Sequence, residues 1–217
     1  MKPTCSNQQN QALTITEVLV VIVTLSLLGA VALAQAAVSQ TDAQRKICVD
    51  NLKQDILAYK IWANDNSGKY PQQISVKKGG AREQAQNGNV AAIFQVMSNE
   101  LSTPKILVCP ADTDHSVAKF FTSLNNSHIS YFASLSASDG RPFTILIGDD
   151  NFTIGRKSAK SGLLEFSTNA PISWTTERHE NGGNIGLAEG SVWETDDHSL
   201  VQKLVEGGLA TNRLAIP

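Results

Sequence analysis

The sequence lacks an excess of positive charge, and one long stretch of it lacks charge altogether. Its 217 residues carry a formal net charge of −2, whereas domains that bind nucleic acid usually present a basic surface to the phosphates. Binding of nucleic acid is therefore not expected. Between Glu17 and Asp42 no charged side chain occurs for 24 residues. This uncharged run dominates the amino-terminal part of the chain.

Motifs that support catalysis are also missing. The sequence contains no Gly-x-Ser-x-Gly segment, no His-Glu-x-x-His segment and no phosphate-binding loop. Its histidines lack the spacing of zinc ligands, and no two cysteines form a Cys-x-x-Cys pair. The sequence therefore predicts a protein that is not an enzyme and holds no zinc. The four histidines are His115, His128, His179 and His198.

Proline is absent from residues 13–63, which favours one continuous helix of about 50 residues. Its first part, residues 13–38, has roughly 20 mainly apolar positions, which at about 1.5 Å per residue match a hydrocarbon core of about 30 Å. We expect a transmembrane or filament-core helix there. In residues 39–66 apolar side chains recur every three or four positions, which predicts an amphipathic continuation. These side chains are Cys48, Leu52, Ile56, Tyr59 and Ala63.

The remaining residues, 67–217, predict a globular α+β head. A short helix is expected over 90–101, a last helix over 200–205, and a hairpin turn at 188–191. The expected fold is a long amino-terminal helix packed on a small antiparallel sheet. Short apolar runs between turn-forming residues predict the strands of that sheet at 106–108, 130–133, 143–147, 184–187 and 192–195.

The segment Ala12-Leu-Thr-Ile-Thr-Glu17, followed by the apolar run, resembles the processing site of type IV prepilins. In that family a short polar leader ends in a small residue, cleavage follows it, and glutamate is the fifth residue of the mature chain. The resemblance implies a leader of residues 1–12, cleavage between Ala12 and Leu13, and methylation of the new amino terminus. It also implies a pilin-like head and an assembly role for Glu17, whose carboxylate would pair with the amine of a neighbouring subunit.

The function implied by this resemblance is structural. The chain would be a subunit of a type II secretion pseudopilus or of a type IV pilus-like filament, inserted once in the inner membrane with its head in the periplasm. Implied partners are prepilin peptidase/N-methyltransferase, other pilin or pseudopilin subunits in a homo-oligomeric helical filament, and an inner-membrane assembly platform with its ATPase. Protein secretion is favoured over adhesion because the chain lacks a late pair of cysteines.

Three cysteines are present, and Cys5 would be removed with the leader. Cys48 and Cys109 would then remain in an oxidising compartment, where a disulfide is chemically allowed. A bridge that closes a loop of about 60 residues would stabilise the fold by about 4 kcal/mol. Two buried thiols are the alternative, because the sequence does not give the distance between them.

A second resemblance begins at His179 and ends at Glu189-Gly190. The segment is similar to a histidine, nine residues, Asp-Gly element of pilin-like proteins from planctomycete and verrucomicrobial bacteria, with Glu189 in place of the aspartate. We expect a structural turn in which His179 hydrogen-bonds the glycine-rich loop and has a carboxylate of the following hairpin as its partner. An enzymatic interpretation would make His179 a general base oriented by Glu189 or Glu177.

Asp149-Asp150-Asn151 forms an oxygen-rich corner after a predicted strand. Asp149 and Asp150 are candidate calcium ligands, and the resemblance to pseudopilins, some of which hold calcium, is compatible with this. Calcium needs about six to eight oxygens, however, and Asp-Asp-Asn is also ordinary turn composition. No other cofactor is expected. Asp112 and Asp114 are expected in a solvated loop after Pro110.

Two other interpretations of the amino-terminal region are compatible with its sequence. A secretory signal peptide would be cleaved at a small-x-small site such as Ala34-Gln-Ala36 or Ala32-Leu-Ala34, and an uncleaved helix would be a plain anchor. The chain would then be a membrane-anchored or secreted binding module, or a hydrolase that uses His179. The apolar region exceeds the roughly 7–15 residues of a signal peptide, which favours the prepilin interpretation.

Overall fold

The structure is a computed structural model that describes residues 14–217, except for the side chains of residues 29–39. Ala12, Leu13 and the rest of the predicted leader lie outside the described residues. The chain divides into two compact units, Met1–Gln40 and Thr41–Pro217. Helix α1, Ile15–Asp65, contributes residues to both units, and each unit is described by itself.

Helix α1 begins with a capping box formed by Thr14 and Glu17. The backbone N–H and the hydroxyl of Thr14 each donate to Oε2 of Glu17 at 2.8 Å, and the Thr14 hydroxyl accepts from the Glu17 N–H at 3.4 Å. Thr14 precedes the first helical residue, so the pair matches the Thr-x-x-Glu pattern that satisfies free N–H groups at a helix start. Glu17 therefore has a local role that the sequence analysis did not predict.

The first turns of α1 carry apolar side chains on every side of the helix. Consecutive residues carry exposed apolar side chains, so the exposed apolar surface is not limited to one stripe along the helix. The exposed side chains are Ile15, Val18, Leu19, Val20, Val21, Ile22, Val23, Leu25, Leu27 and Leu28, with exposed fractions from 43% for Val18 to 81% for Ile15.

The predicted transmembrane half of α1 is contradicted. Within the described residues, no helix combines the length and the apolar character that crossing a bilayer requires. The predictions of a single-pass inner-membrane location and of a pilin-like membrane-helix architecture are wrong for the same reason.

The second unit holds the later turns of α1 against its core. The predicted apolar stripe from Cys48 to Ala63 is buried, with exposed fractions of 0–3%. A Cβ atom at Gly186 would lie 2.3 Å from Cδ1 of Ile56. Glycine at this position therefore lets α1 approach the sheet closely.

A six-stranded antiparallel sheet forms the centre of this unit, in the order β5-β9-β1-β2-β7-β8. A second, three-stranded sheet has the order β4-β3-β6. The α+β class and the antiparallel sheet agree with the sequence analysis. The strands are β1 Tyr131–Ser134, β2 Ile145–Asp149, β3 Phe152–Ile154, β4 Lys157–Ser158, β5 Gly162–Ser167, β6 Ile172–Trp174, β7 Gly183–Leu187, β8 Val192–Thr195 and β9 Thr211–Ile216.

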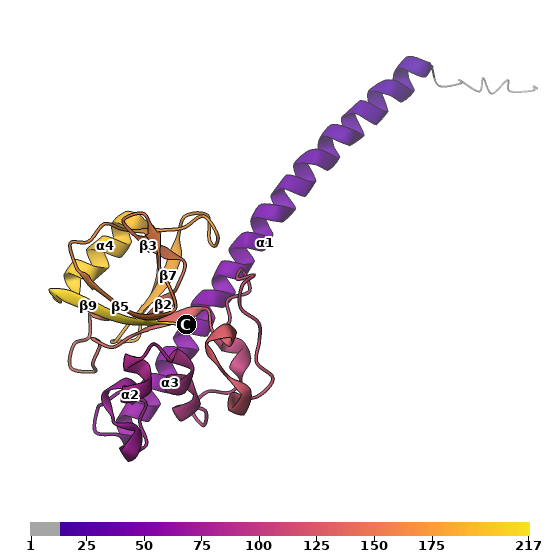
Figure 1. Cartoon of the computed structure of the whole chain (residues 1–217). Helices are drawn as coiled ribbons and strands as arrows, with labels where there is room; N and C mark the ends of the chain where they lie inside the picture. The colour runs from indigo at the N-terminus through magenta and orange to yellow at the C-terminus, as the bar shows by residue number, and fades with distance from the viewer. Residues whose placement is uncertain (1–13) are drawn as a thin grey trace, which may run out of the picture. The chain divides into compact units, whose positions relative to one another are not determined.

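Other elements cover both faces of the large sheet (Figure 1), and each face carries a hydrophobic core. Alternate residues of β1 point to opposite faces: Tyr131 and Ala133 join the core with α1, α2 (Arg82–Gln86) and α3 (Val90–Val96), whereas Phe132 joins the other. That second core is covered by α4 (Asp197–Glu206) and the small sheet. Five short 3₁₀ helices occur in the connections: Pro71–Gln73, Val76–Lys78, Pro104–Leu107, Phe121–Ser123 and Asn126–His128.

Two differences from the predicted elements have clear physical causes. The expected strand at 106–108 is largely a 3₁₀ helix, Pro104–Leu107, because proline at its first position fixes a helical φ and Thr103 caps it. Strand β9 was not predicted, because residues 211–216 are not bounded by turn-forming residues on both sides, as the predicted strands are. In the structure the burial of its first residues alternates, as in other strands. β9 lies between β5 and β1 and so completes the sheet.

Asp55 on α1 is a buried carboxyl group with no hydrogen-bond partner within the described part of the chain. Burial raises its pKa well above the usual value. Below about pH 4 the Asp55 carboxyl group is protonated in both the folded and the unfolded chain, so its burial carries no ionisation penalty. As the pH rises above this value, the group ionises more readily in the unfolded chain, and the folded state loses stability. We expect Asp55→Asn, which cannot ionise, to gain at least about 1 kcal/mol over the natural chain at pH 7 and little at pH 4.

Urea unfolding between pH 4 and pH 8 measures this difference. Asp50→Asn on the same helix is the matched control, because Asp50 is exposed and its replacement should shift stability by less than about 0.5 kcal/mol at every pH. A difference in stability between the Asp55→Asn variant and the natural chain that does not widen as the pH rises would contradict the raised pKa of Asp55.

Candidate functional site

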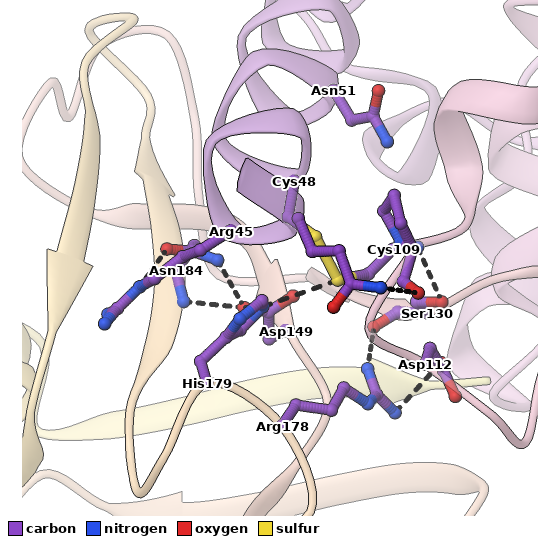
Figure 2. Close-up of a disulfide and its surroundings, with 12 residues drawn as sticks. Arg45, Cys48, Asn51, Cys109, Asp112, Ser130, Asp149, Arg178, His179 and Asn184 are labelled. Carbon is purple, nitrogen blue, oxygen red and sulfur yellow. Dashed lines mark hydrogen bonds and ion pairs between the residues drawn. A yellow bond between two sulfur atoms is a disulfide. The ribbon is translucent and has the colours of Figure 1, made fainter. Parts of the chain in front are cut away.

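A disulfide between Cys48 and Cys109 lies at the centre of the candidate site (Figure 2). Cys48 is on α1, Cys109 follows the 3₁₀ helix Pro104–Leu107, and the two Cα atoms are 5.1 Å apart. Both residues are fully buried. Ser130 supports the second cysteine, because its hydroxyl accepts a 3.0 Å hydrogen bond from the Cys109 N–H. The bridge therefore joins α1 to the segment that leads into the sheet.

His179 lies against this bridge. Its Nε2 atom is 3.4 Å from Sγ of Cys109 and 3.5 Å from Oδ2 of Asp149. The loop that presents it is unusual, because His179, Glu180 and Asn181 have φ values of 53°, 54° and 65°. Such left-handed conformations cost free energy in residues other than glycine and persist where the surrounding structure enforces them. The loop therefore holds the imidazole, whose side chain is 1% exposed, at a defined place.

Asp149 ends strand β2 and faces the same point. Its Oδ2 atom accepts hydrogen bonds from the backbone N–H of Asn184 at 2.7 Å and from the Asn184 side chain at 2.9 Å. Its Oδ1 atom is buried and has no hydrogen-bond partner in the described part of the chain. Burial raises the pKa of Asp149 to about 7, against the opposing effects of Arg178 and Asn184.

Electrostatics keep the histidine neutral. Burial, followed by the positive charges of Arg45 and Arg178, lowers the pKa of His179 to about 4. Arg45 lies on α1, where Nε donates to Oδ1 of Asn184 at 3.3 Å and forms an ion pair with Glu194 at 3.2 Å. A neutral imidazole keeps a free lone pair on one ring nitrogen, which is the form that binds metal ions.

A buried ion-pair network adjoins the disulfide. The Arg178 side chain lies 2.6 Å from Oδ1 of Asp150 and 3.0 Å from Oδ2 of Asp112, and it donates to the Ser130 carbonyl at 3.2 Å. The side chains of the three charged residues are at most 8% exposed. Arg178 thus joins the loop before β7 to the segment after Cys109.

The pKa values in this network follow from its charges. Burial alone would raise the pKa of Asp112, but the hydrogen bond from His115 and the charge of Arg178 hold it well below its usual range. His115, whose Nδ1 is 2.8 Å from Asp112, has a raised pKa because of that hydrogen bond. The Asp112 carboxylate is therefore buried and ionised. The predicted solvated loop is wrong for Asp112, which Arg178 and His115 enclose, whereas Asp114 is exposed as predicted.

Glu189 and Gly190, which were expected to form a turn with His179, have other roles in the structure. The Glu189 side chain accepts a hydrogen bond from Ser191, and Gly190 has a φ of 119° in the tight turn between β7 and β8. The carboxylate beside His179 is that of Asp149. Glu189 and Gly190 thus shape a hairpin, while His179 belongs to the disulfide site.

The two candidate calcium ligands also have different partners. Asp149 accepts from Asn184, whereas Asp150 pairs with the Arg178 guanidinium, which already neutralises its charge. Arg178, Asn184 and Ser130 were not predicted as site residues, because single polar residues in short strands and loops carry no motif. They become part of the site only because the folded sheet places them beside Cys109 and Asp149.

The geometry does not match a catalytic triad. In such triads one imidazole nitrogen faces the nucleophile while the other is oriented by a carboxylate. Here the sulfur and the Asp149 carboxylate contact the same nitrogen of His179, and the Cys109 sulfur is already bonded to Cys48. The arrangement is suited to holding segments together.

Comparisons with protein-family models, with curated proteins and with solved structures found no match to this chain.

Proposed function

We propose that this chain is a non-catalytic structural subunit that assembles with copies of itself through residues Ile15–Leu28 of α1. The observation that carries the proposal is the run of exposed apolar side chains around the whole helix, 43–81% exposed. A helix that is apolar on all sides is stable when it is surrounded. Several neighbouring copies cover such a surface better than one partner does, which favours a bundle or filament over a dimer.

The kind of assembly is the one that the prepilin resemblance implies, namely a secretion pseudopilus or a pilus-like filament. In this proposal prepilin peptidase removes residues 1–12 and frees the amine of Leu13. Glu17 then neutralises the Leu13 amine of a neighbouring copy as the apolar segments pack. An assembly platform with its ATPase would supply the work. The disulfide supports this role by fixing α1 to the core of the second unit.

Sedimentation and electron microscopy of the protein that begins at Leu13 test this function. We expect filaments or large oligomers from the natural sequence, and at least tenfold less assembled material from Val21→Glu, because each buried charge among apolar helices costs about 2–3 kcal/mol or more. Glu17→Gln should also reduce assembly. Glutamine preserves the capping box with Thr14 and removes the negative charge.

Val205→Glu is the matched control, since Val205 is an exposed apolar residue of α4 and its replacement should leave assembly unchanged. Assembly by Glu17→Gln equal to that of the natural chain would assign Glu17 to helix capping alone. A natural chain that stays monomeric, or a native amino terminus near Gln35 in mass spectrometry, would refute the proposed function and favour ordinary secretion.

A further inference from the structure

The described residues bring together three groups of the type that binds transition metals. Sγ of Cys48, Sγ of Cys109 and a ring nitrogen of His179 all lie within 4.8 Å of one another. They come from α1, from the segment before β1 and from the loop before β7. No local motif indicates this cluster, because the ligands are 61 and 70 residues apart along the chain.

The distances already approach those of a tetrahedral zinc site. With Zn–S near 2.3 Å and Zn–N near 2.1 Å, a sulfur and a nitrogen ligand lie about 3.6 Å apart. The observed separation between Cys109 Sγ and His179 Nε2 is 3.4 Å. The two sulfurs must separate to about 3.8 Å, which requires that their bond be broken first.

Asp149 provides an independent sign of a missing ligand. Its Oδ1 atom is fully buried and has no hydrogen-bond partner in the described part of the chain, and such a group normally has one. The other carboxylate oxygen, 3.5 Å from Nε2 of His179, shows that the carboxylate faces the cluster (Figure 2). Its oxygens lie outside the three atoms that cluster within 4.8 Å of one another, so Asp149 would complete a set of two sulfurs, one nitrogen and one oxygen by moving toward the sulfurs when the bridge opens.

We propose that reduction of the Cys48–Cys109 disulfide creates a zinc site with Cys48, Cys109, His179 and Asp149 as ligands. A dithiol reductant passes two electrons and two protons to the bridge, which yields two thiols and the disulfide of the reductant. Zn²⁺ then binds both sulfurs as thiolates, and two protons leave. The oxidised and the zinc-bound forms exclude each other, and both connect α1 to the sheet. The chain would keep this connection in oxidising and in reducing compartments alike.

Metal binding to the full chain, carrying Cys5→Ser to remove the third thiol, tests this proposal. The protein is reduced with a phosphine, gel-filtered with ZnCl₂, and its zinc content is measured by mass spectrometry. We expect one zinc per reduced chain and none per oxidised chain. Cobalt(II) as a probe should give the absorption of a tetrahedral site with two thiolates.

Single variants assign the ligands. Cys48→Ser and His179→Ala should weaken zinc binding by at least tenfold, whereas His198→Ala, which removes an exposed histidine, should leave it unchanged. Circular dichroism confirms that each variant is folded.

A measurement on the unmutated ligand set avoids any dependence on folding of the variants. Zinc should slow alkylation of Cys48 and Cys109 in the reduced chain at least tenfold, and a chelator should reverse this. Absence of zinc from the reduced chain, zinc that binds equally to the His179→Ala variant, or alkylation that zinc does not slow would overturn the proposal.

Discussion

Replacement of Arg178 by methionine is expected to lower the free energy of unfolding by about 3–5 kcal/mol, the usual cost of removing one partner from a buried ion pair. The guanidinium lies between Asp112 and Asp150, and all three side chains are almost fully buried. Without it, two largely buried carboxylates lose the positive charge that they share. Chemical denaturation of the variant and of the natural chain measures the loss.

Two further variants separate charge from packing. Arg178→Met combined with Asp150→Asn should recover part of the lost stability, because it removes one of the uncompensated charges. Lys53→Met is the control, since the Lys53–Asp50 pair is exposed, and its loss should cost less than about 1 kcal/mol. A cost for Arg178→Met as small as that of the control would show that the buried network contributes no net stability.

Loss of the Cys48–Cys109 disulfide should destabilise the second unit by about 4 kcal/mol, because the bridge closes a loop of 61 residues in the unfolded chain. The variant Cys48→Ala/Cys109→Ala tests this in urea with a chelator present. Alanine avoids placing new polar atoms in the buried site. The natural chain after reduction should lose a similar amount.

Cys5→Ala is the control for the disulfide experiment, since Cys5 takes no part in the bridge. Its unfolding midpoint should equal that of the natural chain under oxidising conditions. A natural chain whose stability is the same before and after reduction would contradict the stabilising role of the bridge. Recovery of stability when zinc is added to the reduced natural chain, but not to the double alanine variant, is expected from the proposed zinc site.

Local sequence patterns were sufficient to predict those helices and strands whose formation depends on neighbouring residues. The spacing from Cys48 to Ala63 predicted which face of α1 is buried, because helical geometry alone places such residues on one side. The run at 192–195 predicted β8 with its observed bounds. The prediction failed at 106–108, where Pro104 imposes a 3₁₀ helix on an apolar run that otherwise suits a strand.

The amino-terminal segment shows where a local pattern allows more than one explanation. Glu17 before an apolar run fits the prepilin motif, yet the same residue and Thr14 form a capping box. The transmembrane prediction for residues 13–38 is contradicted, because no helix within the described residues is both long and apolar enough to cross a bilayer. A hydrophobic count over a window cannot distinguish these cases, because lipid and neighbouring helices cover apolar surface equally well.

The sequence by itself determined the α+β class, the buried stripe of α1 and the absence of a known catalytic motif, since each depends on residue type and short-range spacing. The tertiary structure decided the site. Cys48, Cys109, Asp149 and His179 meet because an antiparallel sheet brings the end of β2 beside the start of β7 and because α1 packs across it. Such contacts join residues far apart in the chain, and no short-range pattern encodes them.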